Sequence, residues 1–359
     1  MRVVIRVGLI GYGYAARTFH APLLASVPGM ALTLVASSDA AKVHADLPSV
    51  TVAADPVAVA TSDAIDLVVI ASPNASHAPL ATAALRAGRH VVVDKPFTLD
   101  TAEARDLIGL ATARDRLLSV FHNRRWDSDW LTVNRAIRDG VVGRPVHLES
   151  HIDRFRPAVR ARWREDGSPG SGIWYDLGPH LVDQAILLFG LPERVQASMA
   201  RQREGALADD WAHVVLDHGD GRRAVLHAAM LVAGGSPRFV VHGDGGSIVK
   251  HRPDRQEAQL LDGIRPGADG WGVDDDPLRL FDREGNVTTR PADAGDQRCY
   301  YAAIAAALRG EGANPVPPVQ ALAVMAVVEA AAIAAATGQA AVPDLTDRER
   351  VGLIASYRA

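Results

Sequence analysis

The chain has 359 residues, of which 48% are hydrophobic and 22% are charged, with a formal net charge of −4 at pH 7. This length predicts two domains with sizeable hydrophobic cores, and so small a net charge argues against a protein that binds nucleic acid. The single cysteine, Cys299, excludes an intramolecular disulfide and a Cys-x-x-Cys metal site.

No secretory or membrane-spanning segment is predicted. The N-terminal residues enter a strand pattern at once, without the apolar core and cleavage site of a signal peptide. The most apolar stretch, Ala321 to Ala336, contains Glu329 and has the moderate hydrophobicity of a buried helix rather than of a membrane span. We therefore expect a cytoplasmic protein without a membrane partner.

The first predicted unit is a strand, a tight turn and a helix. A branched apolar run ends at Ile10, the turn Gly11-Tyr12-Gly13-Tyr14-Ala15 follows, and an amphipathic pattern then extends to Ser26. Glycines at the first two motif positions let the backbone turn and lie against a pyrophosphate, while the helix N-terminus offers free N–H groups to the phosphates. Ala16 replaces the third glycine of G-x-G-x-x-G, where a small residue suffices. The pattern favours a dinucleotide site, although a turn without a ligand fits the same residues.

The second strand, Met30 to Ala36, ends at a run that bears on cofactor choice. In a dinucleotide-binding fold that prefers NAD, an acidic side chain at this point usually accepts hydrogen bonds from the adenosine ribose. Here Ser37 and Ser38 follow the strand and Lys42 comes soon after, which favours NADP. Asp39 leaves NAD open, and it is also a suitable N-cap for the next helix.

A further strand delivers polar residues to the same edge of the sheet. Residues 65–71 form this strand, and the loop Ser72-Pro73-Asn74-Ala75-Ser76-His77 should touch the cofactor because ligands bind at the carboxyl ends of parallel strands. His77 is either catalytic or, as we prefer, a histidine at a helix start near solvent or the cofactor. The remaining elements of this domain, which we assign to residues 1–121, are helices over 78–87 and 98–114 and strands over 90–93 and 117–121.

The strand that begins at His90 ends in Asp94-Lys95-Pro96. A residue before proline is held in extended geometry, and an X-Pro bond at a functional edge can be cis. The ammonium group of Lys95 can polarise or protonate a carbonyl oxygen, or help to deprotonate an alcohol, if its neighbours tune its pKa. The alternative is a surface lysine that pairs with Asp94. Both residues also count among the candidate cofactor contacts.

Strict strand–helix alternation ends after Phe121. A strand is predicted over 146–155. Arginines are concentrated from the end of this strand onward, at Arg154, Arg156, Arg160, Arg162 and Arg164. These arginines form either a clamp for a polyol, phosphate or carboxylate or a solvated loop with salt bridges between subunits. Alternating segments farther on predict an open, largely antiparallel sheet, so we assign an α+β domain to residues 122–359. The predicted elements are helices over 127–139, 300–309 and 321–336 and strands near 194–199, 212–216, 223–231 and 238–241, with a polar loop over 251–294.

The second informative stretch carries Asp176 and His180 behind the glycines of residues 170–172. Four residues apart on a helix, the two side chains share one face. Imidazole suits general acid–base work on an alcohol, and a nearby carboxylate can orient it or hold substrate hydroxyls. A metal pair is the less favoured alternative because further ligands are not evident. A capping aspartate beside a packed histidine also remains open.

In this order, the motifs resemble the Gfo/Idh/MocA oxidoreductase family over nearly the whole chain. That family typically has Glu-Lys-Pro where this chain has Asp94-Lys95-Pro96, and a glycine-rich segment before D-x-G-x-H, which Asp176, Gly178 and His180 match. A subgroup that includes NADP-dependent scyllo-inositol dehydrogenases is similar in three further stretches, at residues 18–23, 121–129 and 172–177. The resemblance implies an N-terminal Rossmann domain and a C-terminal α+β domain that binds substrate and forms oligomers.

The resemblance also implies an activity: hydride transfer between NADP or NAD and a carbinol carbon of a cyclic polyol or sugar. His180 is expected to exchange the proton with the substrate hydroxyl, Lys95 to act electrostatically at that oxygen, or the reverse, while Asp176 orients substrate or His180. Further candidate substrate contacts are Asn123, Arg124, Arg154, Trp174 and Tyr175.

We expect a homodimer or homotetramer, with an apolar sheet face buried between subunits and with C-terminal helices able to return to the first domain. Two other functions stay open. One is a nucleotide-sensing regulator without turnover. The other is an enzyme that uses the cofactor transiently to cleave glycosides or isomerise its substrate.

Overall fold

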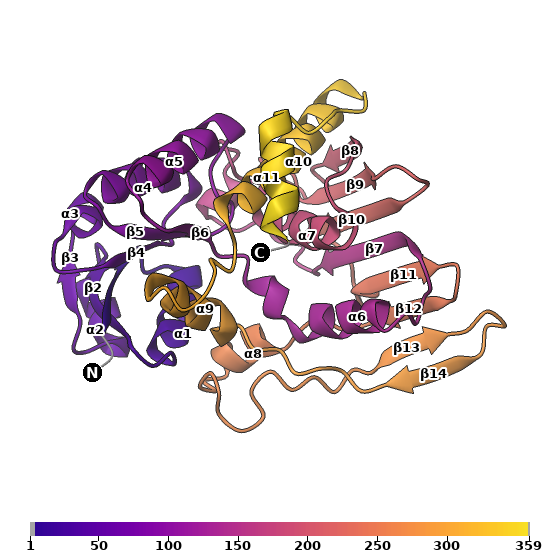
Figure 1. Cartoon of the computed structure of the whole chain (residues 1–359), viewed down its shortest axis with the longest axis horizontal. Coiled ribbons are helices and arrows are strands. Elements are labelled where there is room, and N and C mark those ends of the chain that lie inside the picture. Colours follow the sequence, from indigo (N-terminus) through magenta and orange to yellow (C-terminus); the bar gives the residue numbers. More distant parts are fainter. Residues whose placement is uncertain (1–3, 358–359) are drawn as a thin grey trace.

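The computed structural model describes residues 4–357 and contains two sheets (Figure 1). The first sheet is six-stranded and parallel, with the order β3-β2-β1-β4-β5-β6, which confirms the predicted Rossmann domain. The strand order reverses between β1 and β4, and ligands of such sheets bind in the crevice at this point. The strands are β1 (Ile5–Ile10), β2 (Met30–Ala36), β3 (Thr51–Ala53), β4 (Leu67–Ile70), β5 (His90–Val93) and β6 (Leu118–Val120).

Helices cover both faces of this sheet, so its central strands are buried on each side. Every residue of β4 is fully shielded from solvent, as are the three valines of β5. The first helix differs from expectation, because a π-helical segment over Ala16–His20 precedes α1 (Ala21–Ala25). Such insertions into a helix are frequent at functional sites. The other helices are α2 (Ala40–Asp46), α3 (Pro56–Thr61), η2 (Asn74–Ser76), α4 (His77–Arg86) and α5 (Thr101–Ala113).

The second sheet has eight strands in the order β14-β13-β12-β11-β7-β10-β9-β8. Only β7 and β10 pair in parallel, so the predicted mostly antiparallel sheet is confirmed. Helices α7 (Ile173–Phe189) and α10 (Pro318–Thr337) pack on one of its faces. The strands are β7 (Pro145–Asp153), β8 (Arg194–Ala200), β9 (Trp211–Asp217), β10 (Arg223–Ala229), β11 (Phe239–Gly243), β12 (Ser247–Lys250), β13 (Leu278–Phe281) and β14 (Val287–Arg290).

The expectation of a loop over residues 251–294 is wrong in part. This segment contains α8 (Gln256–Leu261) and the strand pair β13–β14. The two strands lie at the edge of the sheet, where three residues of β14 are exposed and the hydrophobic alternation that would reveal a strand is absent. Helix α8, which the expectation of a loop also missed, brings an acidic side chain to the site, as shown below.

The uncovered face of the second sheet is more polar than we expected. Leu148, Val214 and Leu226 are fully buried under the helices, whereas the alternating residues on the other face are half-buried. That face carries histidines on several neighbouring strands, including the adjacent His213 and His227, whose Nδ1 atoms lie 3.4 Å apart. We expected an apolar sheet face that oligomer formation would bury, and this expectation of an apolar face is wrong.

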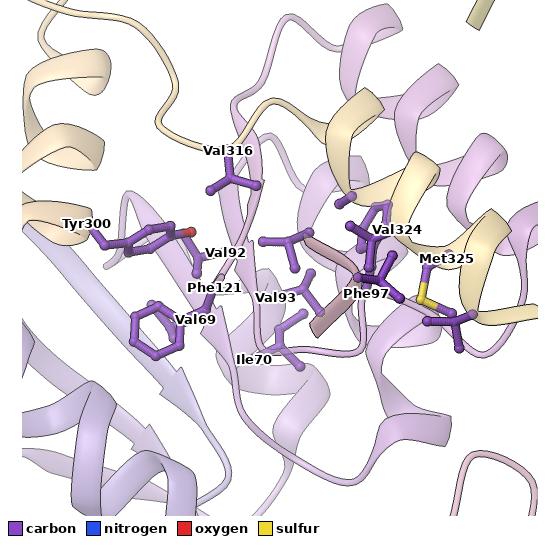
Figure 2. Packing of buried hydrophobic residues seen from close by; sticks show 14 of the residues in the cluster. Val69, Ile70, Val92, Val93, Phe97, Phe121, Tyr300, Val316, Val324 and Met325 are labelled. Carbon is purple, nitrogen blue, oxygen red and sulfur yellow. The ribbon is translucent and has the colours of Figure 1, made fainter. Parts of the chain in front are cut away.

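The C-terminal helices pack back against the first domain. Helix α10 contacts α5, α9 (Arg298–Leu308) contacts α1, and Glu329 of α10 accepts hydrogen bonds from the backbone and hydroxyl of Thr101 at 2.7 and 3.0 Å. Figure 2 shows Val316, Val324 and Met325 beside apolar side chains of the first domain. Helix α10 is long and apolar enough to cross a membrane, but 67% of its apolar window is buried in the protein, as predicted for a core helix.

Four further elements complete the described fold. They are η3 (Asn123–Trp126), α6 (Ser128–Arg138), η4 (Trp163–Glu165) and α11 (Asp347–Ser356). Helix α11 begins at Thr346 with a capping box, in which the Thr346 hydroxyl accepts from Glu349 N–H and the Glu349 carboxylate accepts from Thr346 N–H.

Candidate active site

A cavity with about 660 Å³ of space, partly open to solvent, lies where the carboxyl edge of the first sheet meets the second domain. Both domains contribute to its wall, and the three residues proposed for catalysis all line it. The lining residues are Tyr14, Ala15, Phe19, Asp94, Lys95, Phe121, Asn123, Arg124, Arg154, Arg162, Arg164, Asp176, Leu177, His180 and Glu257.

Lys95 joins the two domains at the floor of this cavity. Its Nζ donates to the main-chain oxygen of Asp176 at 2.7 Å and to the Asp176 carboxylate at 2.9 Å. The Lys95–Pro96 bond is cis. The alternative of a surface lysine paired with Asp94 is wrong, because the side chain is only 13% exposed and Asp94 accepts from the backbone N–H of Lys95 instead.

Asp176 is held as a carboxylate by two cations. Burial alone would raise its pKa, but the Lys95 ammonium and the Arg164 guanidinium, whose Nε lies 3.3 Å from the carboxylate, hold the pKa well below its ordinary value. Asp176 is not the cap of its helix. The first free N–H groups of α7 are met by Asp209, whose carboxylate accepts from Trp174 N–H at 3.0 Å.

The start of α7 fixes the direction in which Asp176 and His180 project. Gly172 precedes the helix with φ +93°, and a Cβ there would collide with the Asp209 carboxylate. Inside the helix, Gly178 lies against the indole of Trp174, which a Cβ would approach to 2.8 Å. These close contacts keep one face of α7 packed while the next face meets the cavity.

His180 lines the cavity one helical turn after Asp176 and is 5% exposed. Burial, and then the charges of Lys95 and Arg124, hold the pKa of His180 well below 6.5. Its Nδ1 is buried and, within residues 4–357, has no hydrogen-bond partner. The imidazole is therefore neutral at pH 7, which is the state that can accept a proton.

The glycine turn fits the pyrophosphate of a dinucleotide. Gly11 has φ +89°, and a Cβ there would come within 3.0 Å of the Ala71 carbonyl oxygen. A Cβ at Gly13 would meet no atom of the described chain within 4 Å, so the backbone at this point borders open space. Tyr14 beside it donates its hydroxyl proton to Glu257 at 2.7 Å, so α8 of the second domain holds the turn.

At the end of β2, Asp39 is the N-cap of the next helix. Asp39 caps α2 by accepting from Lys42 N–H at 2.9 Å, and the Ser37 hydroxyl donates to the Asp39 main-chain oxygen at 3.3 Å. Ser38 is exposed at the same strand end, and the exposed Lys42 borders a second, open groove with Tyr12 and Gly13. The Asp39 carboxylate is thus engaged with its own helix.

Two of the loop residues predicted to touch the cofactor contact backbone oxygens of the protein. His77 is buried, with ring nitrogens 2.8 Å from the Pro96 oxygen and 3.0 Å from the Ser72 oxygen, so placing it near solvent was wrong. Asn74 donates to the Gly170 oxygen at 2.9 Å and links the domains. Ser72 and Pro73 lie beside the glycine turn, where Cα of Ser72 lies within 3.1 Å of a Cβ built at Gly11.

The predicted substrate contacts divide into two groups. Asn123, Arg124 and Arg154 line the cavity. Trp174 does not, because it is fully buried and donates its indole N–H to the Val328 oxygen at 3.0 Å. The prediction of Trp174 as a substrate contact is therefore wrong. Tyr175 is partly buried against the core and is also outside the lining.

Glu257 is the site residue that sequence reasoning missed. Burial would raise its pKa, but Arg124, 3.6 Å away, and the Tyr14 hydroxyl outweigh it and lower the pKa. The surrounding sequence is polar and rich in loop-forming residues, so no signal marked this short helix.

Residues 4–357 contain no group of three or more His, Cys, Asp or Glu side chains arranged to hold a metal ion.

Comparison with known proteins agrees with this geometry. Residues 5–122 match the family model described as "Oxidoreductase family, NAD-binding Rossmann fold", and residues 134–343 match the model for the C-terminal alpha/beta domain of the same family. The chain belongs to the Gfo/Idh/MocA oxidoreductase family. It is thus a member of a family whose N-terminal domain binds NAD(P).

Three relatives indicate how far this assignment extends. The uncharacterized oxidoreductase YdgJ of Escherichia coli is 53% identical over 90% of this chain and 94% of its own length. IolW of Bacillus subtilis, a scyllo-inositol 2-dehydrogenase (NADP(+)), is 35% identical over 91% of this chain and 92% of its own. A crystal structure of a candidate oxidoreductase from Klebsiella pneumoniae is 58% identical, with a TM-score of 0.93 over 99% of this chain and 100% of its own.

Proposed function

We propose that this oxidoreductase is an NAD(P)-dependent dehydrogenase that oxidises a carbinol carbon of a cyclic polyol or sugar, or reduces the matching ketone. The observation that carries the proposal is the convergence of Lys95, Asp176 and His180 at one cavity beside the glycine turn. The nicotinamide, when bound, supplies the hydride acceptor or donor. The chain's own residues hold the substrate oxygen and manage its proton.

The charge states favour one division of roles. His180, whose pKa is held well below 6.5, is neutral at pH 7 and accepts the hydroxyl proton as the alcohol is oxidised. The Lys95 ammonium donates two of its three N–H groups to Asp176, which leaves the third to donate to the developing alkoxide. Asp176 acts by fixing the position of this ammonium.

NADP is the cofactor that these residues favour. A carboxylate at the end of β2 would repel the 2′-phosphate, but the Asp39 carboxylate caps α2 and Lys42 is exposed nearby. The NADP dependence named for IolW supports the same choice. IolW also supports an inositol as the first substrate to test.

The proposal extends to where and how the protein works. We place it in the cytoplasm, as a homodimer or homotetramer assembled through the uncovered face of the second sheet, since closed homo-oligomers are the commonest assemblies of soluble oligomeric proteins. A small polyol or sugar is the partner, without nucleic acid or membrane.

The test is a cofactor-reduction screen. Purified protein is mixed with NADP or NAD and a panel of inositols, sugars and sugar alcohols, and the absorbance of the reduced nicotinamide is followed against product formed. We expect one reduced nicotinamide per substrate oxidised. Tight cofactor binding without turnover on any carbinol would overturn the proposal in favour of a nucleotide-sensing regulator, and conversion without net cofactor reduction would favour redox-assisted chemistry.

A further inference from the structure

The arginine segment, residues 154–165, forms one wall of the cavity. Three of its side chains, Arg154, Arg162 and Arg164, line the space in which the substrate of the proposed reaction would sit. A neutral polyol offers these cations only hydroxyl groups. Three guanidinium groups on one wall are better suited to binding an anionic group.

Hydrogen bonds to its backbone hold the segment in position. Arg154 and Arg156 donate backbone N–H groups to the oxygens of Ala229 and Met230 at 2.9 and 2.7 Å. The buried Arg203 donates to the backbone oxygens of Arg156 and Ala158.

At the other end of the segment, Glu165 closes the turn. Its carboxylate accepts from the backbone N–H of Arg160 and from the side chain of Arg162, and it pairs with Arg203 at 2.9 Å. The backbone of the segment and the side chain of Arg162 are therefore ordered before any ligand arrives, which lowers the entropic cost of binding.

The positive charge in the cavity exceeds its negative charge. Its lining includes five cationic side chains, Lys95, Arg124, Arg154, Arg162 and Arg164, and three carboxylates, Asp94, Asp176 and Glu257. Lys95 and Arg164 share Asp176. Two cations pair with carboxylates outside the lining, Arg124 with Asp127 and Arg162 with Glu165. Within residues 4–357, Arg154 has no carboxylate partner within 4.0 Å, although it lies close enough to Asp176 and Glu257 to act on both electrostatically, and it is half-exposed.

Electrostatic effects on neighbouring groups point the same way. Burial, followed by the charges of Arg154, Arg160 and Arg162, lowers the pKa of Arg156. Nearby like charges disfavour the charged form of a guanidinium, and here their effect opposes that of Glu257, which raises this pKa. Bound nicotinamide, which is itself cationic when oxidised, adds to this surplus.

We propose that the substrate carries an anionic group, a carboxylate or a phosphate, and that Arg154 binds it together with Arg162 and Arg164. The planar guanidinium fork matches both anions and grips either with paired hydrogen bonds. The inference rests on the proposed dehydrogenase function and narrows its substrate class from neutral polyols to sugar acids or sugar phosphates. The cofactor's own phosphates have their place at the glycine turn and at the end of β2.

The test measures binding rather than turnover, so that it stands even where the proposed reaction fails. The NADPH-loaded protein is titrated by calorimetry with D-glucuronate and D-glucose 6-phosphate, and with D-glucose and myo-inositol as neutral probes, all at one ionic strength. We expect at least one anionic probe to bind tenfold or more tightly than D-glucose, with the stronger of the two distinguishing carboxylate from phosphate. Equal binding of anionic and neutral probes would overturn the inference.

Arg154→Gln is the decisive variant and Arg160→Gln its matched control, because Arg160 lies in the same segment but is exposed and outside the lining. Arg154→Gln should weaken the preferred anion about tenfold and leave D-glucose unchanged, while Arg160→Gln should change neither. A loss of NADPH affinity in Arg154→Gln, without a change in anion binding, would assign the arginine to the cofactor and refute the proposal. An equal effect of Arg160→Gln would attribute the change in anion affinity to general surface charge and refute the proposal.

Discussion

Replacing Lys95 by alanine tests both the chemistry and the electrostatics of the site. The substitution removes the N–H that faces the substrate oxygen in the proposed reaction, and the charge that, after burial, most lowers the pKa of His180. Loss of such a group typically lowers turnover by about 10²-fold, which corresponds to ~2.7 kcal/mol of transition-state stabilisation. Asp176 keeps Arg164 as a partner at 3.3 Å, so the carboxylate is not left without a counter-charge.

The same substitution should move the pH dependence of the reaction. The Lys95 charge is the second cause, after burial, that keeps the pKa of His180 low. Activity in the oxidative direction requires neutral His180 and is lost as the pH falls through this pKa. Removing the charge raises the pKa toward 6.5, so the acidic limb of kcat/KM should begin at a higher pH in Lys95→Ala than in the parent protein.

The assay is a steady-state pH profile of kcat/KM for oxidation, accompanied by NADPH titration and thermal melting to verify an intact fold. Lys95→Arg is the control: it retains the charge but changes the geometry, so turnover should fall while the acidic limb stays in place. Turnover of Lys95→Ala within a few-fold of the parent, or an unmoved acidic limb, would refute the assignment of Lys95 as the cation beside the base.

Further predictions concern the cofactor, the fold and the assembly. Lys42→Ala should weaken NADPH about tenfold and leave NADH nearly unchanged, as fluorescence titration would reveal; equal losses would contradict the NADP assignment. Glu257→Gln should weaken NADPH a few-fold by loosening Tyr14, and an unchanged dissociation constant would remove α8 from cofactor binding. Burial lowers the pKa of His122 from 6.5 to about 4, so the unfolded chain takes up its proton first as the pH falls. This residue alone should then cost about 2 kcal/mol of unfolding free energy between pH 7 and pH 5, a loss that His122→Asn should reduce in urea titrations. Light scattering at micromolar concentration should give a dimer or tetramer mass, and a monomer mass would refute the proposed assembly.

Sequence reasoning was strongest where local pattern and function coincide. The apolar strands of the first sheet, the glycine turn and the Asp94-Lys95-Pro96 strand end carry periodic or motif signals within a few residues. The local pattern alone therefore places Lys95 at the correct edge of the sheet. Its partner did not follow from the pattern, because Asp176 lies 81 residues away and only packing of the two domains unites them.

The failures share a physical cause. Trp174 belongs to the same motif as Asp176, but the helix directs its indole to the Val328 oxygen in the core. His77 follows a strand end as a ligand contact would, yet its ring serves two backbone carbonyls. In each case a side chain beside the site satisfies the scaffold's own hydrogen bonds, a choice that depends on tertiary contacts and leaves no trace in residue spacing.

Placing base and cation on different domains has a consequence for catalysis. His180 belongs to α7 of the second domain, but its pKa depends on Lys95, which ends a strand of the first. Lys95 is in turn held by the carbonyl and carboxylate of Asp176, one turn before His180 on the same helix. Any motion that parts the domains breaks these hydrogen bonds and moves the ammonium away, which raises the pKa of His180 toward its ordinary value. In the proposed reaction, contact between the domains therefore brings the base and the cation that stabilises the alkoxide together, and a motion that parted the domains would separate them.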